Sequence, residues 1–140
     1  MTLERTLTII KPDSVASGKS GEIIAAIEDA GFRILGMKKL HLSRDAAEAF
    51  YQVHHEKPFF NSLVTFMTEG PVISMALERD NAITKLREIM GATNPTSAAE
   101  GTIRNRFGTN IERNAIHGSD APETAAIELN FFFNEMELQG

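Results

Sequence analysis

An α+β domain with an antiparallel sheet is the fold class that this sequence predicts, and three observations lead to it. Short apolar or β-branched runs recur along the chain, with segments of helical spacing between them. The 140 residues are enough for a single domain (1–140) with a core of its own, and no repeat or linker divides them. The third observation is the order in which strands and helices follow one another.

The N-terminal third predicts a strand, a helix and a second strand. Residues 5–11 (RTLTIIK) alternate and then become continuously apolar, which predicts a buried strand ended by Pro12. Residues 18–30 carry isoleucines at helical spacing, and Gly31 stands where a C-cap glycine is expected. Residues 32–42 (FRILGMKKLHL) predict the second strand.

The middle of the chain predicts two helices and a third strand. Ser43 is a typical N-cap for a helix over residues 44–54. Pro58 opens another helix, which a Gly-Pro pair ends. Residues 72–77 (VISMAL) form a short run that is almost wholly apolar, as in a buried strand.

The C-terminal part predicts a helix over 81–90, a long irregular loop, a short strand over 115–117 and a last helix. The loop covers about 91–113 and has only a short helical hint around 97–103. Irregular loops of this length are uncommon in small domains and are usually functional.

The last helix has a capping-box-like start, because Glu123 follows Asp120 by three residues. Its buried face is predicted to consist of Pro122, Ala125, Leu129, Phe132 and Phe133. Without the extra helices, the order of elements is βαββαβ, the ferredoxin-like arrangement. We therefore expect a four-stranded antiparallel sheet with helices packed on one face, plus the long irregular loop.

Composition narrows the possible partners and location. A formal net charge of −5 argues against duplex nucleic acid, whose binding needs a basic surface. A few cations inside one cleft can still bind small phosphate compounds. The absence of cysteine excludes disulfides, thiolate nucleophiles and cysteine-based zinc sites. The N-terminal stretch has charges at Glu4 and Arg5 and a brief apolar run, so we expect no signal peptide, no membrane span and a cytoplasmic location.

Three short patterns have a chemical interpretation that their spacing makes weak. The triplet GKS from Gly18 resembles the end of a phosphate-binding loop, but such a loop needs glycine at the position of Asp13. His54 and His55 are adjacent, so their side chains project in different directions and rarely share one metal ion. The HGSD segment has the residue types of a hydrolase triad without a glycine-flanked serine elbow.

His117, in the stretch NAIHGSD, has two interpretations: a structural histidine, or a nucleophile that faces a cleft. Glu128 breaks the apolar surface of the last helix, and a carboxylate there usually has a partner such as imidazole. Cations and polar donors that suit polyphosphate oxygens gather around the irregular loop; they are Arg87, Thr93, Asn94, Thr102, Arg104 and Asn114. From these residues alone, the two interpretations remain balanced.

Four segments resemble the nucleoside diphosphate kinase family, in order and nearly end to end. They are RTLTIIKPDSV, YQVHHEKPFF, GATNPTSAAEGTIR and NAIHGSD, and NxxHGSD is a highly specific signature. The resemblance implies a ping-pong phosphotransferase. In such an enzyme the γ-phosphoryl group of a nucleoside triphosphate passes to a histidine, and then to a different nucleoside diphosphate.

The resemblance also implies roles for the matched residues. His117 is the phosphorylated nucleophile, Glu128 orients its imidazole, and Ser119 joins that network; neutral imidazole is nucleophilic near pH 7. Lys11 reaches the phosphoryl group and the ribose hydroxyl. The other matched residues are the phosphate donors Arg87, Thr93 and Arg104, the ligand of the sugar 3′-hydroxyl Asn114, and Tyr51 and His54 at the phosphate end of the site.

Broad base specificity is implied as well, because Phe59 would stack on one face of the base and Ile111 would form an apolar wall opposite. The expected substrates are ATP, GTP, UDP, CDP and their deoxy forms. Mg²⁺ would be held mainly by nucleotide phosphates and water, with Asp120 as an outer-shell partner. The family forms homo-oligomers built from dimers, and three consecutive phenylalanines in the tail (ELNFFFNEMELQG) fit a subunit contact.

The sequence departs from the family pattern at a few positions. Asn105 and Arg106 replace a common Gly-Asp, Ala121 and Pro122 replace a common Ser-Val, and Glu112 stands where glycine is more usual. These positions bear on the loop's interfaces and on subunit assembly, and none is a matched site residue. The alternative function is a non-catalytic binding domain on the same scaffold, which loss of the histidine, lysine or arginines would favour.

Overall fold

The computed structural model describes residues 3–140, in which four strands form one antiparallel sheet. The strands are β1 (Leu3–Ile10), β2 (Arg33–Leu40), β3 (Val72–Asp80) and β4 (Ile116–Gly118), and their order across the sheet is β2-β3-β1-β4. In the sheet register, Ile9 of β1 lies opposite Ser74 of β3 and His117 of β4. The predicted four-stranded antiparallel sheet is confirmed.

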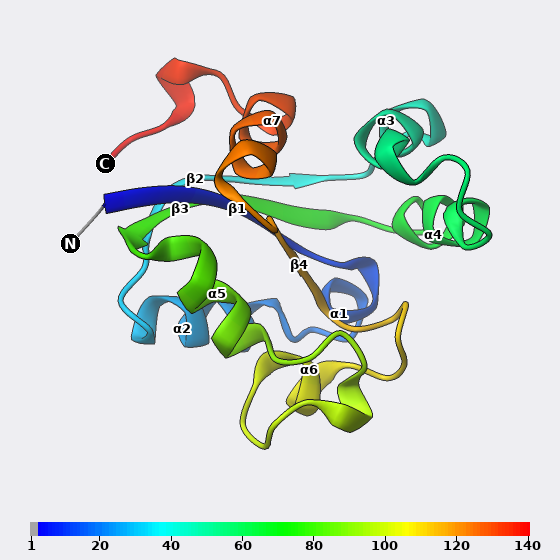
Figure 1. Ribbon diagram of the computed structural model, residues 1–140, viewed down its shortest axis with the longest axis horizontal. Helices are drawn as coiled ribbons and strands as arrows, with labels where there is room; N and C mark the ends of the chain where they lie inside the picture. Colours follow the sequence, from blue (N-terminus) through cyan, green and yellow to red (C-terminus); the bar gives the residue numbers. More distant parts are fainter. Residues whose placement is uncertain (1–2) are drawn as a thin grey trace.

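Helices cover both faces of this sheet (Figure 1). They are α1 (Pro12–Ala16), α2 (Ser20–Asp29), α3 (Arg44–Phe50), α4 (Phe60–Met67), α5 (Ala82–Met90), α6 (Ile103–Phe107) and α7 (Pro122–Phe132), with 3₁₀ turns at Gln52–His54, Pro95–Ser97 and Glu135–Glu137. In Figure 1, α3 and α7 lie above the sheet, whereas α2, α5 and α6 lie below it. The expectation that helices pack on one face was therefore wrong, because the elements outside βαββαβ cover the second face.

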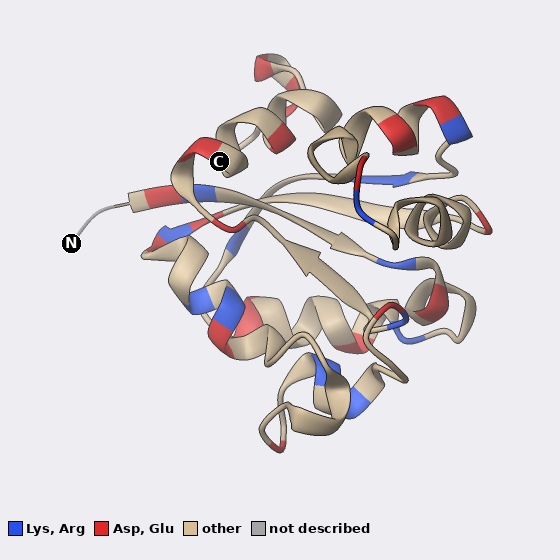
Figure 2. Cartoon of the chain, turned by 45° about the vertical axis from the view of Figure 1, so that its right-hand side comes forward, with Lys and Arg blue, Asp and Glu red and all other residues tan. Residues whose placement is uncertain are grey.

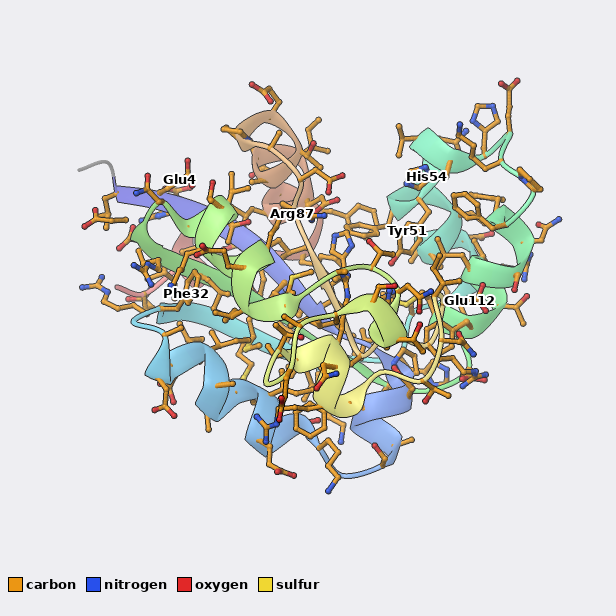
Figure 3. All side chains as sticks on the ribbon, turned by 60° about the horizontal axis from the view of Figure 1, so that its bottom comes forward. Glu4, Phe32, Tyr51, His54, Arg87 and Glu112 are labelled. Atoms are coloured by element: carbon orange, nitrogen blue, oxygen red, sulfur yellow. The ribbon has the colours of Figure 1, made fainter. Side chains whose placement is uncertain are left out.

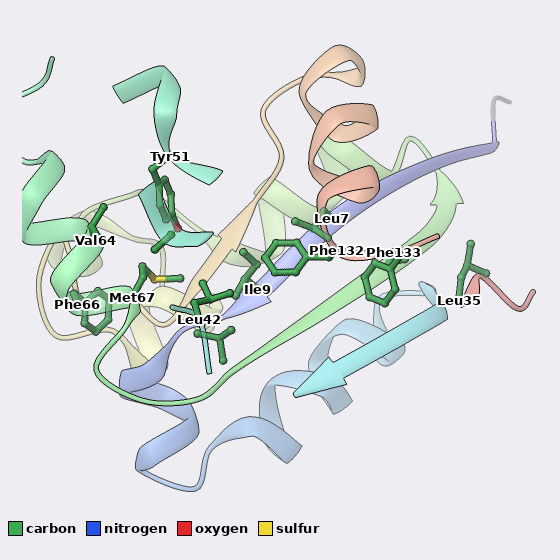
Figure 4. Close-up of a cluster of buried hydrophobic side chains, with 13 residues drawn as sticks. Leu7, Ile9, Leu35, Leu42, Tyr51, Val64, Phe66, Met67, Phe132 and Phe133 are labelled. Carbon is green, nitrogen blue, oxygen red and sulfur yellow. The ribbon is translucent and has the colours of Figure 1, made fainter. Parts of the chain in front are cut away.

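Each face of the sheet has its own apolar core. On one side, Leu7 and Ile9 pack with residues of α3, α4 and α7 (Figure 4). On the other side, Ile10 and Ile116 pack with residues of α2, α5 and α6. The end of β1 is consequently buried on both faces, which explains why its sequence is apolar without interruption.

The segment after β1 differs from the prediction. Pro12 ends the strand as expected, but it also occupies the first position of α1, where its missing N–H costs nothing. Gly18 has φ +76° and separates this short helix from α2, which begins at Ser20. Gly31 follows α2 with φ +90°, as expected for a glycine at the end of a helix.

Two helix starts gave opposite outcomes. The Ser43 side chain accepts a hydrogen bond from the Ala46 N–H at 3.1 Å, so the predicted N-cap is confirmed. The capping box at Asp120 was wrong, since α7 begins after Ala121, which has no side-chain cap. Pro122 is exposed and does not belong to the buried face of the helix.

Other boundaries shift by a few residues. The predicted helix over 44–54 ends as α3 at Phe50 and continues as a 3₁₀ turn. Inside the irregular loop, the helical hint at 97–103 lies too early, because α6 begins at Ile103 with Thr102 as its N-cap. Within residues 3–140, no helix combines the length and the apolar character that crossing a membrane requires.

Candidate active site

His117 lies in β4 and contacts the last helix. Its Nε2 atom is 2.9 Å from Oε1 of Glu128 on α7, and the Ser119 hydroxyl donates to the same oxygen at 2.7 Å. The structure therefore brings together three residues that the sequence analysis had assigned to one network. The imidazole and the carboxylate are both mostly buried, so water competes little with their contact.

The charge state of Glu128 fixes the imidazole tautomer. Burial raises the pKa of Glu128, but the hydrogen bonds from His117 and Ser119, together with the charges of His117 and His54, outweigh burial and hold it below its usual value. An ionised carboxylate can only accept hydrogen bonds, so Nε2 of His117 carries the hydrogen in this contact. The lone pair of neutral His117 is then on Nδ1.

Two aromatic residues of the α3 region pack around the imidazole. The Phe50 ring lies 5.5 Å from the His117 ring between centroids, and the Tyr51 ring lies 6.3 Å from it, both edge-on. Burial, and then the nearby charge of Glu128, raise the pKa of Tyr51, so its hydroxyl stays protonated. Phe50 was not among the predicted site residues, because an aromatic on an apolar helix face usually indicates only core packing.

Lys11 and Asn114 form a second polar contact beside β4. The Nζ atom of Lys11, whose residue is only 6% exposed, donates to Oδ1 of Asn114 at 2.7 Å. The Asn114 amide donates in turn to the backbone oxygens of Thr93 and Ile111, at 3.0 Å each. Burial, followed by the positive charge of Arg104, lowers the pKa of Lys11 to about 8.

The two arginines differ in how they are held. Arg104 is buried and donates to the backbone oxygens of Gly91 at 3.2 Å and Ile116 at 2.8 Å, and its Nε has no protein partner within residues 3–140. Burial and the charge of Arg87 lower the pKa of Arg104 to about 10. Arg87 is more exposed and pairs with Asp120 at 3.0 Å. Two guanidinium groups thus lie close enough to repel each other, which an anion between them would relieve.

Two apolar side chains that were predicted to bind the base are exposed. Phe59 is 46% exposed, and its ring packs 5.4 Å from the His54 ring between centroids. Ile111, in the irregular loop, is 64% exposed. Figure 3 shows Tyr51 and His54 on one side of β4 and Arg87 on the other.

The donors for a metal ion are few at this site. Across residues 3–140, no group of three or more His, Cys, Asp and Glu side chains has an arrangement that could hold an ion. Asp120 offers one exposed carboxylate beside Arg87. Figure 2 shows that acidic and basic segments are interspersed over the helices and loops. A single carboxylate, that of Asp120, fits a metal ion that is held mainly by a ligand's phosphates.

An imidazole held by a carboxylate, with a buried lysine and two arginines in the adjoining segments, is an arrangement that suits an enzyme of phosphoryl transfer. The family model for nucleoside diphosphate kinase matches residues 4–138, and the chain belongs to that family. The resemblance of the sequence segments is confirmed, and with it an enzyme that acts on nucleotides.

Individual relatives agree with this assignment over their whole length. The chain is 61% identical to a nucleoside diphosphate kinase of Trichlorobacter lovleyi, over 99% of the chain and 100% of the relative. It is 57% identical to that of Geobacter sulfurreducens, over 97% of the chain and 99% of the relative.

Solved structures give the same result for the fold. The nucleoside diphosphate kinase of Aquifex aeolicus superposes with a TM-score of 0.96 at 43% identity, covering 98% of this chain and 99% of that one. A halophilic nucleoside diphosphate kinase from Halobacterium salinarum in complex with CDP superposes with a TM-score of 0.95 at 38% identity, covering 99% and 93%.

Proposed function

We propose that this nucleoside diphosphate kinase works by a ping-pong mechanism in which Nδ1 of His117 carries the phosphoryl group. The observation that supports this most directly is the 2.9 Å contact between Nε2 of His117 and Glu128. This contact leaves the Nδ1 lone pair free without any prior deprotonation. It also supplies a negative charge that stabilises the imidazolium character of the phosphorylated ring.

The two half-reactions use the same atoms in opposite directions. Nδ1 attacks the γ-phosphorus of a nucleoside triphosphate, the bond to the β,γ-bridging oxygen breaks, and the nucleoside diphosphate leaves with the bond electrons. A second diphosphate then attacks the phosphohistidine with a terminal β-oxygen, and the P–N bond electrons return to Nδ1. Such transfers depend mainly on positioning and on stabilising charge at the equatorial oxygens.

Donors around β4 are proposed to bind the phosphates and the sugar. Lys11 would contact the phosphoryl oxygens and the ribose hydroxyl, and Asn114 would bind the 3′-hydroxyl, which is supported by their mutual contact of 2.7 Å. The remaining phosphate-binding set is Arg87, Thr93, Arg104, Tyr51 and His54. Arg104 donates to two carbonyls with two of its five N–H groups, so it retains donors for a phosphate oxygen.

Broad base specificity is proposed from the two exposed apolar residues. Phe59 would stack on one face of the base and Ile111 would line the other, a contact that purines and pyrimidines make equally. The relative from Halobacterium salinarum that binds CDP shows that one member of the family accepts a pyrimidine. ATP, GTP, UDP, CDP and deoxy forms are therefore all proposed substrates.

Mg²⁺ is the proposed metal, with Asp120 as an outer-shell partner. When bound, it would neutralise charge on the β- and γ-phosphate oxygens.

We further propose a homo-oligomer built from dimers, supported by Phe131, which stays 40% exposed while its two neighbours in the phenylalanine triplet are buried. Sedimentation of the protein as a monomer would contradict that assembly. A cytoplasmic location is proposed from membership of the nucleoside diphosphate kinase family.

The experiment mixes purified protein with γ-labelled ATP and Mg²⁺ in the absence of acceptor. We expect acid-labile, base-stable label on the protein. When UDP is added, the label should move from the protein to UDP and give labelled UTP. His117→Ala should take up no label. His55, an exposed histidine next to His54, serves as the control, and His55→Ala should be labelled like the wild type. If ATP binds but no label forms, the chain is a nucleotide-binding domain and the proposal is wrong.

A further inference from the structure

Ala115, two residues before His117, has an unfavourable backbone conformation. Its φ is +76°, and the N–H of Ile116 donates to the oxygen of Asn114 at 3.0 Å. These two facts describe a γ-turn with a positive φ, which is rare and strained for any residue other than glycine. Such a conformation persists only where surrounding contacts impose it.

The segment that follows β1 supplies those contacts. The N–H of Ala115 donates to Oδ2 of Asp13 at 3.1 Å, and the N–H of Lys11 donates to the oxygen of Ala115 at 2.9 Å. Both backbone polar groups of the strained residue are therefore bound by residues about a hundred positions earlier in the chain. Ala115 is fully buried, so water cannot replace either partner.

The turn separates two residues with different proposed tasks. Asn114 precedes it and contacts Lys11, while His117 follows it in β4, opposite Ile9. A change in the dihedral angles of Ala115 would rotate one residue relative to the other. We propose that Asp13 is a positioning residue, which holds the Ala115 turn so that Asn114 and His117 face the same nucleotide. This inference rests on the proposed function, since it takes those two residues as the sugar ligand and the nucleophile.

The chemistry explains why a carboxylate suits this position. A hydrogen bond from a backbone N–H to a charged acceptor is stronger than one between neutral groups. Asparagine would keep an acceptor oxygen in the same place, but alanine would leave a buried N–H unpaired at a strained turn. Glycine at position 115 adopts a positive φ without steric cost, so it would make the turn independent of Asp13.

The test measures the single-turnover rate of protein labelling at saturating γ-labelled ATP. Asp13→Ala should lower this rate by about 10- to 100-fold, because a displacement near 1 Å costs that much at a reacting centre. Asp13→Asn should stay close to the wild-type rate. The double variant Asp13→Ala/Ala115→Gly should recover most of the lost rate, which a general loss of stability would not explain.

The variants Asp45→Ala and His117→Ala distinguish a failure of this inference from a failure of the proposed function. Asp45→Ala removes the exposed carboxylate at the second position of α3, the place that Asp13 occupies in α1, and should label like the wild type. A normal rate in Asp13→Ala, or no recovery in the double variant, would overturn the inference. If Asp13→Ala does not fold, a folded and active double variant supports it and an unfolded one overturns it. Label that persists in His117→Ala would instead overturn the proposed function.

Discussion

The ammonium group of Lys11 lies 2.7 Å from the amide oxygen of Asn114, although 103 positions separate the two residues in the chain. The contact connects the end of β1 to the residue before the turn that leads into β4. It also keeps a buried cation beside a second one, Arg104, at a site that is proposed to bind polyphosphate. Both cations are therefore destabilised until an anion arrives.

Nucleotide binding should weaken as the pH rises through about 8, the lowered pKa of Lys11. The ammonium is charged below this pH and neutral above it, so the attraction for ADP is lost on the alkaline side. Calorimetric titration of ADP from pH 6.5 to 9.5 measures this, and buffers of different ionisation enthalpy report the proton taken up. Lys11→Met should flatten the profile, and the exposed-lysine control Lys19→Ala should keep it. A constant affinity in the wild type across this range would be contrary to the prediction.

Glu128 should stabilise the fold at neutral pH and lose that effect in acid. Its pKa in the folded protein lies below the ordinary value of 4.5, so its contribution is complete above 4.5 and disappears as the pH falls through the lowered value. Glu128→Gln should therefore be less stable than the wild type at pH 7, by an amount that shrinks in acid. Urea unfolding of both proteins at pH 7 and pH 3.5 tests this, with the exposed Glu123→Gln of the same helix as control. An equal difference at both pH values would contradict it.

Phe50→Ala should cost stability and slow the labelling of His117. Its ring contacts those of His117, Tyr51 and Phe132, so truncation removes packing on several sides and should lower the free energy of unfolding by about 3 kcal/mol. Phe59→Ala is the comparison, because that ring is 46% exposed. It should change stability by less than about 1 kcal/mol but raise the KM for nucleotides. Urea unfolding and steady-state kinetics separate these effects, and equal stability losses would be inconsistent with the packing described.

Gly118→Ala should destabilise the protein, because the added Cβ would lie 2.6 Å from Sδ of Met90 and 3.0 Å from Cδ2 of Leu86. Both side chains are fully buried, so relieving the overlap should cost about 1–3 kcal/mol and should shift the strand that carries His117. Gly21→Ala has no atom within 4 Å of the new Cβ and should stabilise α2 by about 0.5 kcal/mol. Thermal unfolding of the two variants gives the comparison. If Gly118→Ala were as stable as the wild type, Met90 and Leu86 of α5 would have moved aside without cost, contrary to the prediction.

Elements with one strong local signal were the ones predicted correctly. The apolar end of β1 and the run in β3 reflect burial on both faces of the sheet. In α5, Ile83, Leu86 and Met90 follow the helical period and are all buried. These patterns carry the burial of each position directly in the sequence, so no knowledge of distant contacts is needed.

Features that depend on distant partners were missed or misplaced. Pro12 both ends β1 and begins α1, and the second role was missed; α1 carries Asp13, whose carboxylate accepts a hydrogen bond from the N–H of Ala115, about a hundred residues later. The capping box at Asp120 matched a local rule, but that carboxylate pairs with Arg87. The contact of 3.1 Å between Glu112 and Ser62 joins the irregular loop to α4. Spacing along the chain does not reveal such contacts.

The site shows the same division. The carboxylate of Glu128 on an apolar helix surface indicated a buried partner, and His117 is that partner. Arg87 and Arg104 could be grouped from the residues alone because both border the irregular loop, whereas Lys11 lies far away in the chain and was assigned to the site only by the family resemblance. Phe50 had no signal that distinguished it from ordinary core residues.

The central position of β1 determines the order in which the protein can be completed as it is made. This strand is synthesised before its neighbours in the sheet, β3 and β4, which come only at residues 72–80 and 116–118. The helix α7, which covers one face of β1, comes later still. The segment TLTII therefore has no sheet partner until residues 72–80 have been made, and until then it is exposed to aggregation or to capture by a chaperone. The native sheet is therefore complete only after β4, at residues 116–118, has been synthesised.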